Sequence, residues 1–176
     1  MNCTQNPQDV DISVFFVGVK IPEKTKAVVF PVLAKRKKIR LSGYDYSSCG
    51  AYSITLCAKP GVSFGKRVGD GEPVLSACGM IAKEAIEAIE QHYHYVTVER
   101  YRIMPDHIHI LLSIISPDGF QPTDSKSIST IIGQMKRWVS KQMGFPVWQK
   151  SFYDRIIRDK EQYLNTWNYV EYNHKK

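Results

Sequence analysis

The run from residue 107 to residue 115 constrains the fold most, because its side chains alternate in a way that fits an extended chain. Residues i and i+2 of a strand lie on the same face, so His107 and His109 would point to one side. The residues that would point to the other side are Ile108, Ile110, Leu112 and Ile114. Two imidazoles side by side on a rigid strand can hold a metal ion or a phosphate group.

A second strand is predicted directly upstream, from Val96 to Ile103, and only Met104-Pro-Asp106 separates the two. A connection this short predicts an antiparallel hairpin. Strict alternation along the upstream strand would place two sets of side chains on opposite faces: Val96, Val98 and Arg100 against Thr97, Glu99 and Tyr101.

The rest of the chain supplies the partners of this hairpin. Alternating residues predict a strand from 50 to 58 and a short one from 64 to 68, while 148–157 is irregular or partly extended. Helical spacing predicts helices over 79–91 and 126–143, and a last helix from Asp159, with Gln162 completing a capping box. This order predicts an α+β fold, a ferredoxin-like antiparallel sheet with helices packed on one face.

The chain is long enough for one well-buried domain. Residues 35–176 form the predicted catalytic domain, and residues 1–34 form an N-terminal extension or part of the same domain. Neither a signal peptide nor an apolar run long enough to span a membrane is recognisable. The four cysteines lack C-x-x-C spacing, so reduced thiols in a cytoplasmic protein are expected.

The charge balance favours a polyanionic partner, because 24 Lys and Arg face 17 Asp and Glu and give a net charge of +7. A dense basic run near the start is either a solvated face or a set of phosphate contacts. The residues predicted to contact nucleic acid are Arg36, Lys37, Lys38 and Arg40 of this run, and Lys136 and Arg137, which lie off the apolar stripe of their helix.

The last helix carries a polar pair beside its predicted core stripe of Tyr163, Leu164, Trp167 and Val170. At about 100° per residue, Tyr169 points away from this stripe and lies next to Asn173 at i+4. Such a pair can present a phenol and an amide together to a ligand. The alternative is a tyrosine at the edge of the core beside an exposed asparagine.

Five blocks in order resemble REP-associated tyrosine transposases, which are relatives of the IS200-like transposases. Residues 36–55 resemble the start of these proteins, and Met104-Pro-Asp-His-Ile-His-Ile-Leu-Leu112 resembles their His-hydrophobic-His block. Residues 132–136 and 148–159 resemble two later blocks, and Tyr169-Val-Glu-Tyr-Asn173 resembles the catalytic-helix pattern Tyr-Ile-Glu-Asn-Asn. The resemblance covers roughly residues 35–173.

The resemblance implies that His107, His109 and Asn173 bind a divalent metal, Mg²⁺ or Mn²⁺, and that Tyr169 is the nucleophile. The implied enzyme is a single-stranded DNA endonuclease and strand transferase that forms a 5′-phosphotyrosine and acts on hairpin-forming repetitive DNA, as a monomer or a homodimer. Two departures from the family pattern stand out: Asp106 replaces the usual Asn, and His174 replaces the usual Pro.

The chemistry fits these residue types. A divalent cation polarises a phosphodiester and orients it for in-line attack, and a nitrogen-containing ligand set suits Mn²⁺ at least as well as Mg²⁺. A phenol with an ordinary pKa of about 10 must lose its proton to attack. Tyrosine as the nucleophile divides one hard displacement into two easier ones.

Two other interpretations stay open at this stage. The chain could be a relative of such transposases that binds structured DNA or RNA without cutting it. Geometry alone also leaves rival nucleophiles, since Tyr172 lies only about 60° from Tyr169 around the helix. A nucleotide hydrolase of the histidine-triad type is disfavoured, because residue 111, where it needs a third histidine, is Leu.

Overall fold

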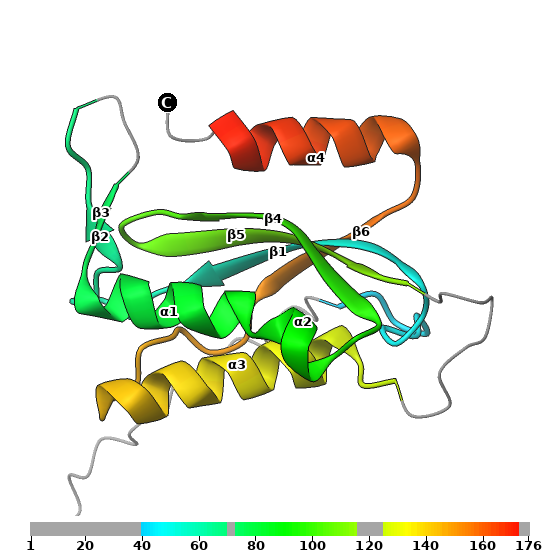
Figure 1. Cartoon of the computed structure of the whole chain (residues 1–176). Helices are drawn as coiled ribbons and strands as arrows, with labels where there is room; N and C mark the ends of the chain where they lie inside the picture. The colour runs from blue at the N-terminus through cyan, green and yellow to red at the C-terminus, as the bar shows by residue number, and fades with distance from the viewer. Residues whose placement is uncertain (1–39, 70–72, 116–124, 173–176) are drawn as a thin grey trace, which may run out of the picture. The chain divides into compact units, whose positions relative to one another are not determined.

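A four-stranded antiparallel sheet organises the chain, with strands in the order β4-β5-β1-β6 (Figure 1). The structure is a computed structural model that describes residues 40–69, 73–115 and 125–172. The strands are β1 (Gly50–Cys57), β4 (Val96–Ile103), β5 (His107–Ile114) and β6 (Tyr153–Ile157). The predicted extension 1–34, the boundary after it, and Arg36, Lys37, Lys38 and Asn173 lie outside the described residues.

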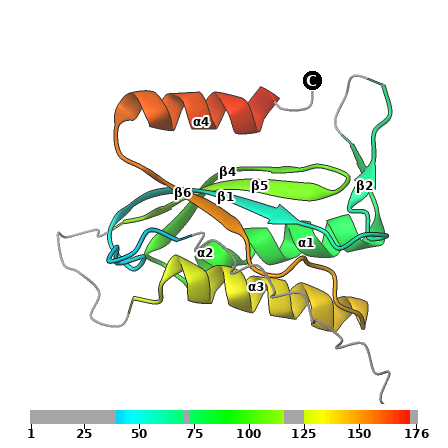
Figure 2. The same ribbon diagram turned by 180° about the vertical axis from the view of Figure 1, so that it is seen from behind.

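Four helices cover the two faces of the sheet. They are α1 (Ala77–Glu87), α2 (Ile89–His92), α3 (Ile128–Met143) and α4 (Lys160–Tyr172). Figures 1 and 2 show α1, α2 and α3 on one face and α4 across the other. Two connections of the form β-α-β, each through a helix of the first layer, give the ferredoxin-like topology. The predicted α+β class and antiparallel sheet are confirmed.

The main core lies between the sheet and the layer of α1 and α3. Tyr52, Ile54 and Leu56 of β1 are fully buried, because alternate residues of the strand point into this layer. The aliphatic face of β5 packs beside them: Ile108, Ile110, Leu112 and Ile114. From α3, the predicted stripe is buried as expected: Ile128, Ile131, Ile132, Met135 and Val139.

Local signals explain the helix ends, although the single helix predicted over 79–91 is two helices, α1 and α2, of which the first begins at Ala77. The Ser76 side chain accepts from the Gly79 amide at the start of α1, and Ser127 caps α3 in the same way. Gly144 ends α3 in the left-handed conformation, with φ of 74°. At the last helix, the Gln162 amide donates to Asp159 Oδ1 at 2.8 Å, which confirms the first half of the predicted capping box.

Two strand assignments differ from expectation. The segment 148–157 contains a regular edge strand, β6, which pairs antiparallel with β1 from Tyr153 opposite Thr55 to Ile157 opposite Ala51. The short strand predicted over 64–68 is β2 (Gly65–Lys66), and it pairs with β3 (Val74–Leu75) outside the main sheet. Both differences come from pairing between strands, which the periodicity of a single segment does not reveal.

A β-bulge changes the faces of β4. The register with β5 shifts between Val98 and Arg100, so Glu99 is an extra residue in the strand. Val98 pairs with Leu112 on the core side, whereas Arg100 pairs with Leu111 on the opposite side. The prediction that Val98 and Arg100 share a face is therefore wrong, because strict alternation does not hold across a bulge.

No helix in the described part of the chain is both long and apolar enough to cross a membrane.

Gly79 lets α1 approach the segment that leads into β2. A Cβ at this position would lie 1.9 Å from the carbonyl oxygen of Phe64. That carbonyl accepts a hydrogen bond from the Ser76 amide at 2.9 Å, and the Phe64 amide donates to the Pro105 carbonyl at 2.8 Å. The start of α1 is thereby tied to the connection that precedes His107.

We expect Gly79→Ala to destabilise the protein by about 3 kcal/mol, because the methyl group must displace backbone. The control is Gly133→Ala in α3, where a Cβ meets nothing within 4 Å. That substitution should instead raise stability by up to about 1 kcal/mol through helix propensity. Urea unfolding followed by circular dichroism measures both. Equal effects of the two substitutions would contradict this account of Gly79.

Candidate functional site

The two histidines lie together on the face of β5 that α4 covers, as the alternation predicts. Their ring centroids are 4.7 Å apart. His109 is buried, with 7% of its surface exposed, while His107 stands nearer to solvent. One row of residues crosses all four strands at His109: Tyr153, Thr55, His109 and Arg102.

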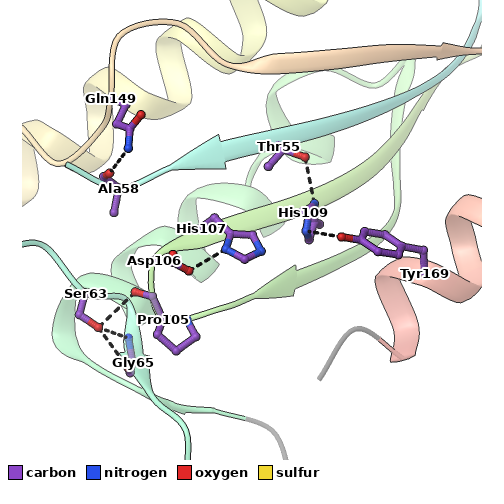
Figure 3. A network of polar contacts seen from close by, with 10 residues as sticks. All are labelled: Thr55, Ala58, Ser63, Gly65, Pro105, Asp106, His107, His109, Gln149 and Tyr169. Carbon is purple, nitrogen blue, oxygen red and sulfur yellow. Dashed lines mark hydrogen bonds and ion pairs between the residues drawn. The ribbon is translucent and has the colours of Figure 1, made fainter. Parts of the chain in front are cut away.

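Each imidazole is held through its Nδ1 atom (Figure 3). Asp106 Oδ1 lies 2.7 Å from Nδ1 of His107, and Thr55 Oγ1 lies 2.9 Å from Nδ1 of His109. Partners at Nδ1 fix the ring orientation and leave Nε2 for a ligand, which is how metal-binding histidines are commonly supported. The unusual Asp106 therefore acts on the orientation of His107.

The connection that carries Asp106 is fixed by backbone hydrogen bonds. The Ala58 amide donates to the Asp106 carbonyl and the Phe64 amide to the Pro105 carbonyl, both at 2.8 Å. The Ser63 hydroxyl also donates to the Pro105 carbonyl, at 3.1 Å. These contacts hold the backbone that precedes the first histidine.

Tyr169 meets the second histidine from the opposite side. Its hydroxyl oxygen lies 3.4 Å from Nε2 of His109, and the two ring centroids are 5.1 Å apart (Figure 3). The tyrosine remains 47% exposed, so its hydroxyl stays accessible to a ligand. The structure thus brings together three predicted site residues, His107, His109 and Tyr169.

Two arginines of β4 hold the end of α4 that carries Tyr169. Arg102 donates from Nε to the Val170 carbonyl at 3.4 Å, and from Nη2 to the Glu171 carbonyl. Arg100 pairs with the Glu171 carboxylate at 2.8 Å and lies over the Trp167 ring at 4.3 Å. Cations at the carboxyl end of a helix satisfy its free carbonyls and complement its dipole.

The predicted core stripe of α4 is only partly correct. Val170 is buried as expected, but Leu164 is 48% exposed. Tyr163 and Trp167 are only partly buried. The helix is held on the sheet by Arg100, Arg102 and the buried Val170 near its end. Its apolar residues are therefore less buried than their spacing predicts.

Burial also sets the charge of the site. Burial, with a smaller contribution from the charge on His107, lowers the pKa of His109 to about 4. His109 is therefore neutral at pH 7. A neutral imidazole is the form that binds a metal ion.

The described residues supply part of a metal site. His107 and His109 offer two Nε2 donors, a set that fits Mn²⁺ or Mg²⁺ only with further oxygen ligands. Within the described ranges, no group of three or more His, Cys, Asp or Glu side chains could hold a metal ion. The third predicted ligand, Asn173, is an amide outside those ranges.

A cavity of about 570 Å³ opens beside His109, between α4 and the strands β1 and β6. Both His109 and Tyr169 line it. Its volume lies in the range of small-molecule sites. The candidate nucleophile therefore faces a space that can hold part of a substrate.

The predicted nucleic-acid contacts are placed differently from one another. Arg40 pairs with Asp154 at 3.7 Å and lies over the Phe152 ring at 4.6 Å. The Lys136 ammonium donates to the carbonyls of Gln149 and Ser151, and burial lowers its pKa. It thus supports the segment before β6. Arg137 is exposed on α3.

Comparison with known proteins places the chain in a family. No protein-family model matches it. An uncharacterised protein of Haemophilus influenzae is 30% identical over 157 residues, covering 78% of this chain and 87% of that protein. The chain belongs to the family of this Haemophilus protein.

A solved structure shares this fold. A REP-associated tyrosine transposase bound to a REP hairpin aligns with a TM-score of 0.58 and 16% identity, over 78% of this chain and 72% of that one. A candidate transposase from Deinococcus radiodurans R1 aligns with a TM-score of 0.42 and 16% identity, over 78% and 98%. The predicted relationship to REP-associated tyrosine transposases is confirmed at the level of fold.

Several residues of the site escaped sequence reasoning. Thr55 supports His109 only because β1 and β5 pair in one particular register. Arg100 and Arg102 face α4 only because of the bulge at Glu99. No local pattern marks any of the three.

We expect Arg102→Met to loosen α4 while leaving the sheet folded. Loss of hydrogen bonds from a charged donor should lower the local opening free energy of the helix by about 2 kcal/mol. Faster amide hydrogen exchange in 160–172 would show it. Arg137→Met, on the exposed surface of α3, is the control and should not change this exchange. Unchanged protection of α4 in Arg102→Met would refute the anchoring role.

We expect the metal-free protein to lose stability as the pH falls from about 6.5 to about 4. The unfolded chain protonates this histidine near 6.5, whereas the folded protein keeps His109 neutral to about 4. The unfolded state binds more protons in this window, so stability rises with pH there, by about 3 kcal/mol in all.

Urea unfolding at a series of pH values, in the presence of EDTA, measures this dependence. His109→Gln should flatten the profile between pH 6.5 and 4. The control is His94→Gln, which removes an exposed histidine and should leave the slope as it is. The same slope in wild type and in His109→Gln would count against the assignment.

Proposed function

We propose that this protein is a metal-dependent single-stranded DNA endonuclease and strand transferase, with Tyr169 as its nucleophile. The observation that carries the proposal is the Tyr169 hydroxyl 3.4 Å from Nε2 of His109, beside a second histidine whose ring is also fixed through Nδ1. Tyr169 and His109 line one cavity, and the ring of His107 lies beside that of His109.

Each side chain has a role in the proposed reaction. The Tyr169 oxygen bonds to phosphorus, the bond from phosphorus to the 3′ oxygen breaks, and that oxygen leaves as a hydroxyl after gaining a proton. The phenolic proton passes to solvent, to which the Tyr169 side chain is exposed. The product is a 5′-phosphotyrosine, which a 3′ hydroxyl can attack later to rejoin strands without ATP.

His107 and His109 would hold the divalent ion, with Asn173 as the proposed third ligand. When bound, Mg²⁺ or Mn²⁺ polarises the scissile phosphate and favours the phenolate. Burial of His109 keeps its ring neutral and thus able to bind a cation at pH 7. Asp106 and Thr55 keep both rings turned so that Nε2 faces the ligand.

The proposed substrate is hairpin-forming single-stranded DNA, met in the cytoplasm, where the protein would associate with the nucleoid. The net charge of +7 supports a nucleic-acid partner. A protein of the same fold is bound to a REP hairpin. A single tyrosine cuts one strand, so the strand must be unpaired at the cut. Either a monomer or a homodimer could act in this way.

A covalent-adduct assay tests the proposal. The protein is incubated with Mn²⁺ or Mg²⁺ and a labelled oligonucleotide that forms a hairpin with single-stranded flanks, then run on a denaturing gel. We expect a labelled protein band with wild type and none after addition of EDTA. Tyr169→Phe should abolish the band, whereas Tyr172→Phe, the matched control on the same helix, should retain it.

Other outcomes separate the competing roles. Loss of the adduct in Tyr172→Phe with retention in Tyr169→Phe would reassign the nucleophile. Hairpin binding without any adduct would favour a relative that binds structured nucleic acid but does not cut it. The observation favouring that second function is Asp106, which stands next to His107 where the family pattern has Asn.

A further inference from the structure

The cavity beside Tyr169 contains polar side chains that the proposed cleavage chemistry does not use. Ser53 of β1, Tyr153 and Arg155 of β6, and Asn165 and Thr166 of α4 line it together with the catalytic candidates. They come from β1 and from the consecutive elements β6 and α4, and the fold gathers them around one space. Such convergence of polar groups in a cavity is typical of a binding site.

Four of these side chains are free to bind a ligand. Among the described residues, Tyr153, Arg155, Asn165 and Thr166 make no side-chain hydrogen bond, ion pair or ring contact. The nearby acid is already neutralised, because Asp154 pairs with Arg40 at 3.7 Å and its side chain is 2% exposed. The cavity therefore offers one unpaired guanidinium, one aromatic face and one free amide.

The sheet register sets the positions of these groups. Tyr153 pairs with Thr55 and Arg155 pairs with Ser53, so both point to the α4 side of the sheet. Thr55 in turn pairs with His109. Tyr153 thus lies two strands from the histidine, about 10 Å at the usual strand spacing. From α4, Asn165 precedes Tyr169 by one helical turn and faces the same cavity.

We propose that this cavity binds one unpaired nucleotide of the strand next to the scissile phosphate. The base stacks on Tyr153, the Asn165 amide contacts the base edge, and Arg155 binds the neighbouring phosphate. The ligand class follows from the groups present: an exposed aromatic ring takes the face of a base only when that base is unpaired. A guanidinium is the preferred partner of a phosphate. The identity of the ligand as DNA rests on the proposed function.

This site gives the protein its own means of selecting the nucleotide beside the cut. Tyr153 is 60% exposed and, among the described residues, its side chain makes no hydrogen bond or ring contact, so the ring is available to a ligand. The amide of Asn165 carries both a donor and an acceptor, and such groups distinguish base edges. Tyr153 would supply affinity for the unpaired nucleotide, and Asn165 would supply the preference for one base over another.

Binding without cleavage tests this inference. The full chain carrying Tyr169→Phe is titrated, in EDTA and low salt, into a fluorescein-labelled oligodeoxythymidylate, and anisotropy gives the affinity. We expect Tyr153→Ala to weaken binding about tenfold, as the loss of one stacked base should. Tyr153→Phe keeps the ring and should keep the affinity. Asn165→Ala should weaken binding several-fold, whereas Asn168→Ala, on the same helix but outside the cavity lining, should not.

A second probe separates stacking from charge. On an oligonucleotide of the same length with abasic sugars throughout, the Tyr153→Ala protein should bind as well as its Tyr153 parent. Arg155→Gln should still weaken binding, because the phosphates remain. A tenfold loss with Tyr153→Ala on the abasic strand would overturn the stacking assignment. Equal losses for Asn165→Ala and Asn168→Ala, or absence of oligonucleotide binding, would overturn the site.

The result is independent of whether the protein cuts DNA. If the cavity variants weaken binding while the adduct assay fails for every hairpin, the nucleotide site stands and the proposed cleavage falls. If the adduct forms normally and the cavity variants bind like their parent, cleavage stands and the nucleotide site falls.

Discussion

The hydrogen bonds from Arg102 to the last turn of α4 are the contacts on which the candidate site depends. They are made by a buried guanidinium and two helix carbonyls, a combination that is strong because one partner is charged. Apart from them, this end of the helix is held by Arg100, which pairs with Glu171 and lies over Trp167, and by Val170, the one buried residue of α4 in the described part of the chain. The position of Tyr169 beside His109 follows from this attachment.

The sheet register connects that attachment to the rest of the site. Arg102, His109, Thr55 and Tyr153 occupy one row across four strands, so the anchor, the buried imidazole, its hydrogen-bond partner and the exposed ring are fixed relative to one another. Strands in a packed sheet are among the most rigid supports in a protein, whereas the tyrosine approaches on a lightly attached helix. The site therefore combines residues on the rigid sheet with a tyrosine on a helix that can move more easily.

Sequence patterns predicted the parts of this arrangement that depend on near neighbours. The two histidines on one face of β5, the buried stripe of α3 and the cap of α4 at Asp159 all follow from spacing within one element. The rest depends on contacts between distant segments. β6 forms because it finds β1, Thr55 supports His109 through strand pairing, and Leu164 is exposed because α4 meets little core. No pattern within a single segment of the sequence predicts which distant segment it will contact.

The bulge at Glu99 has a second consequence, for the outer edge of the sheet. β4 is an edge strand, and an unprotected edge offers a row of free backbone groups to any other extended chain. The extra residue interrupts that row and increases the local twist. Charged side chains at Glu99 and Arg100 add a further obstacle. The irregularity that turns the arginines toward α4 thus also makes this edge a poor template for aggregation.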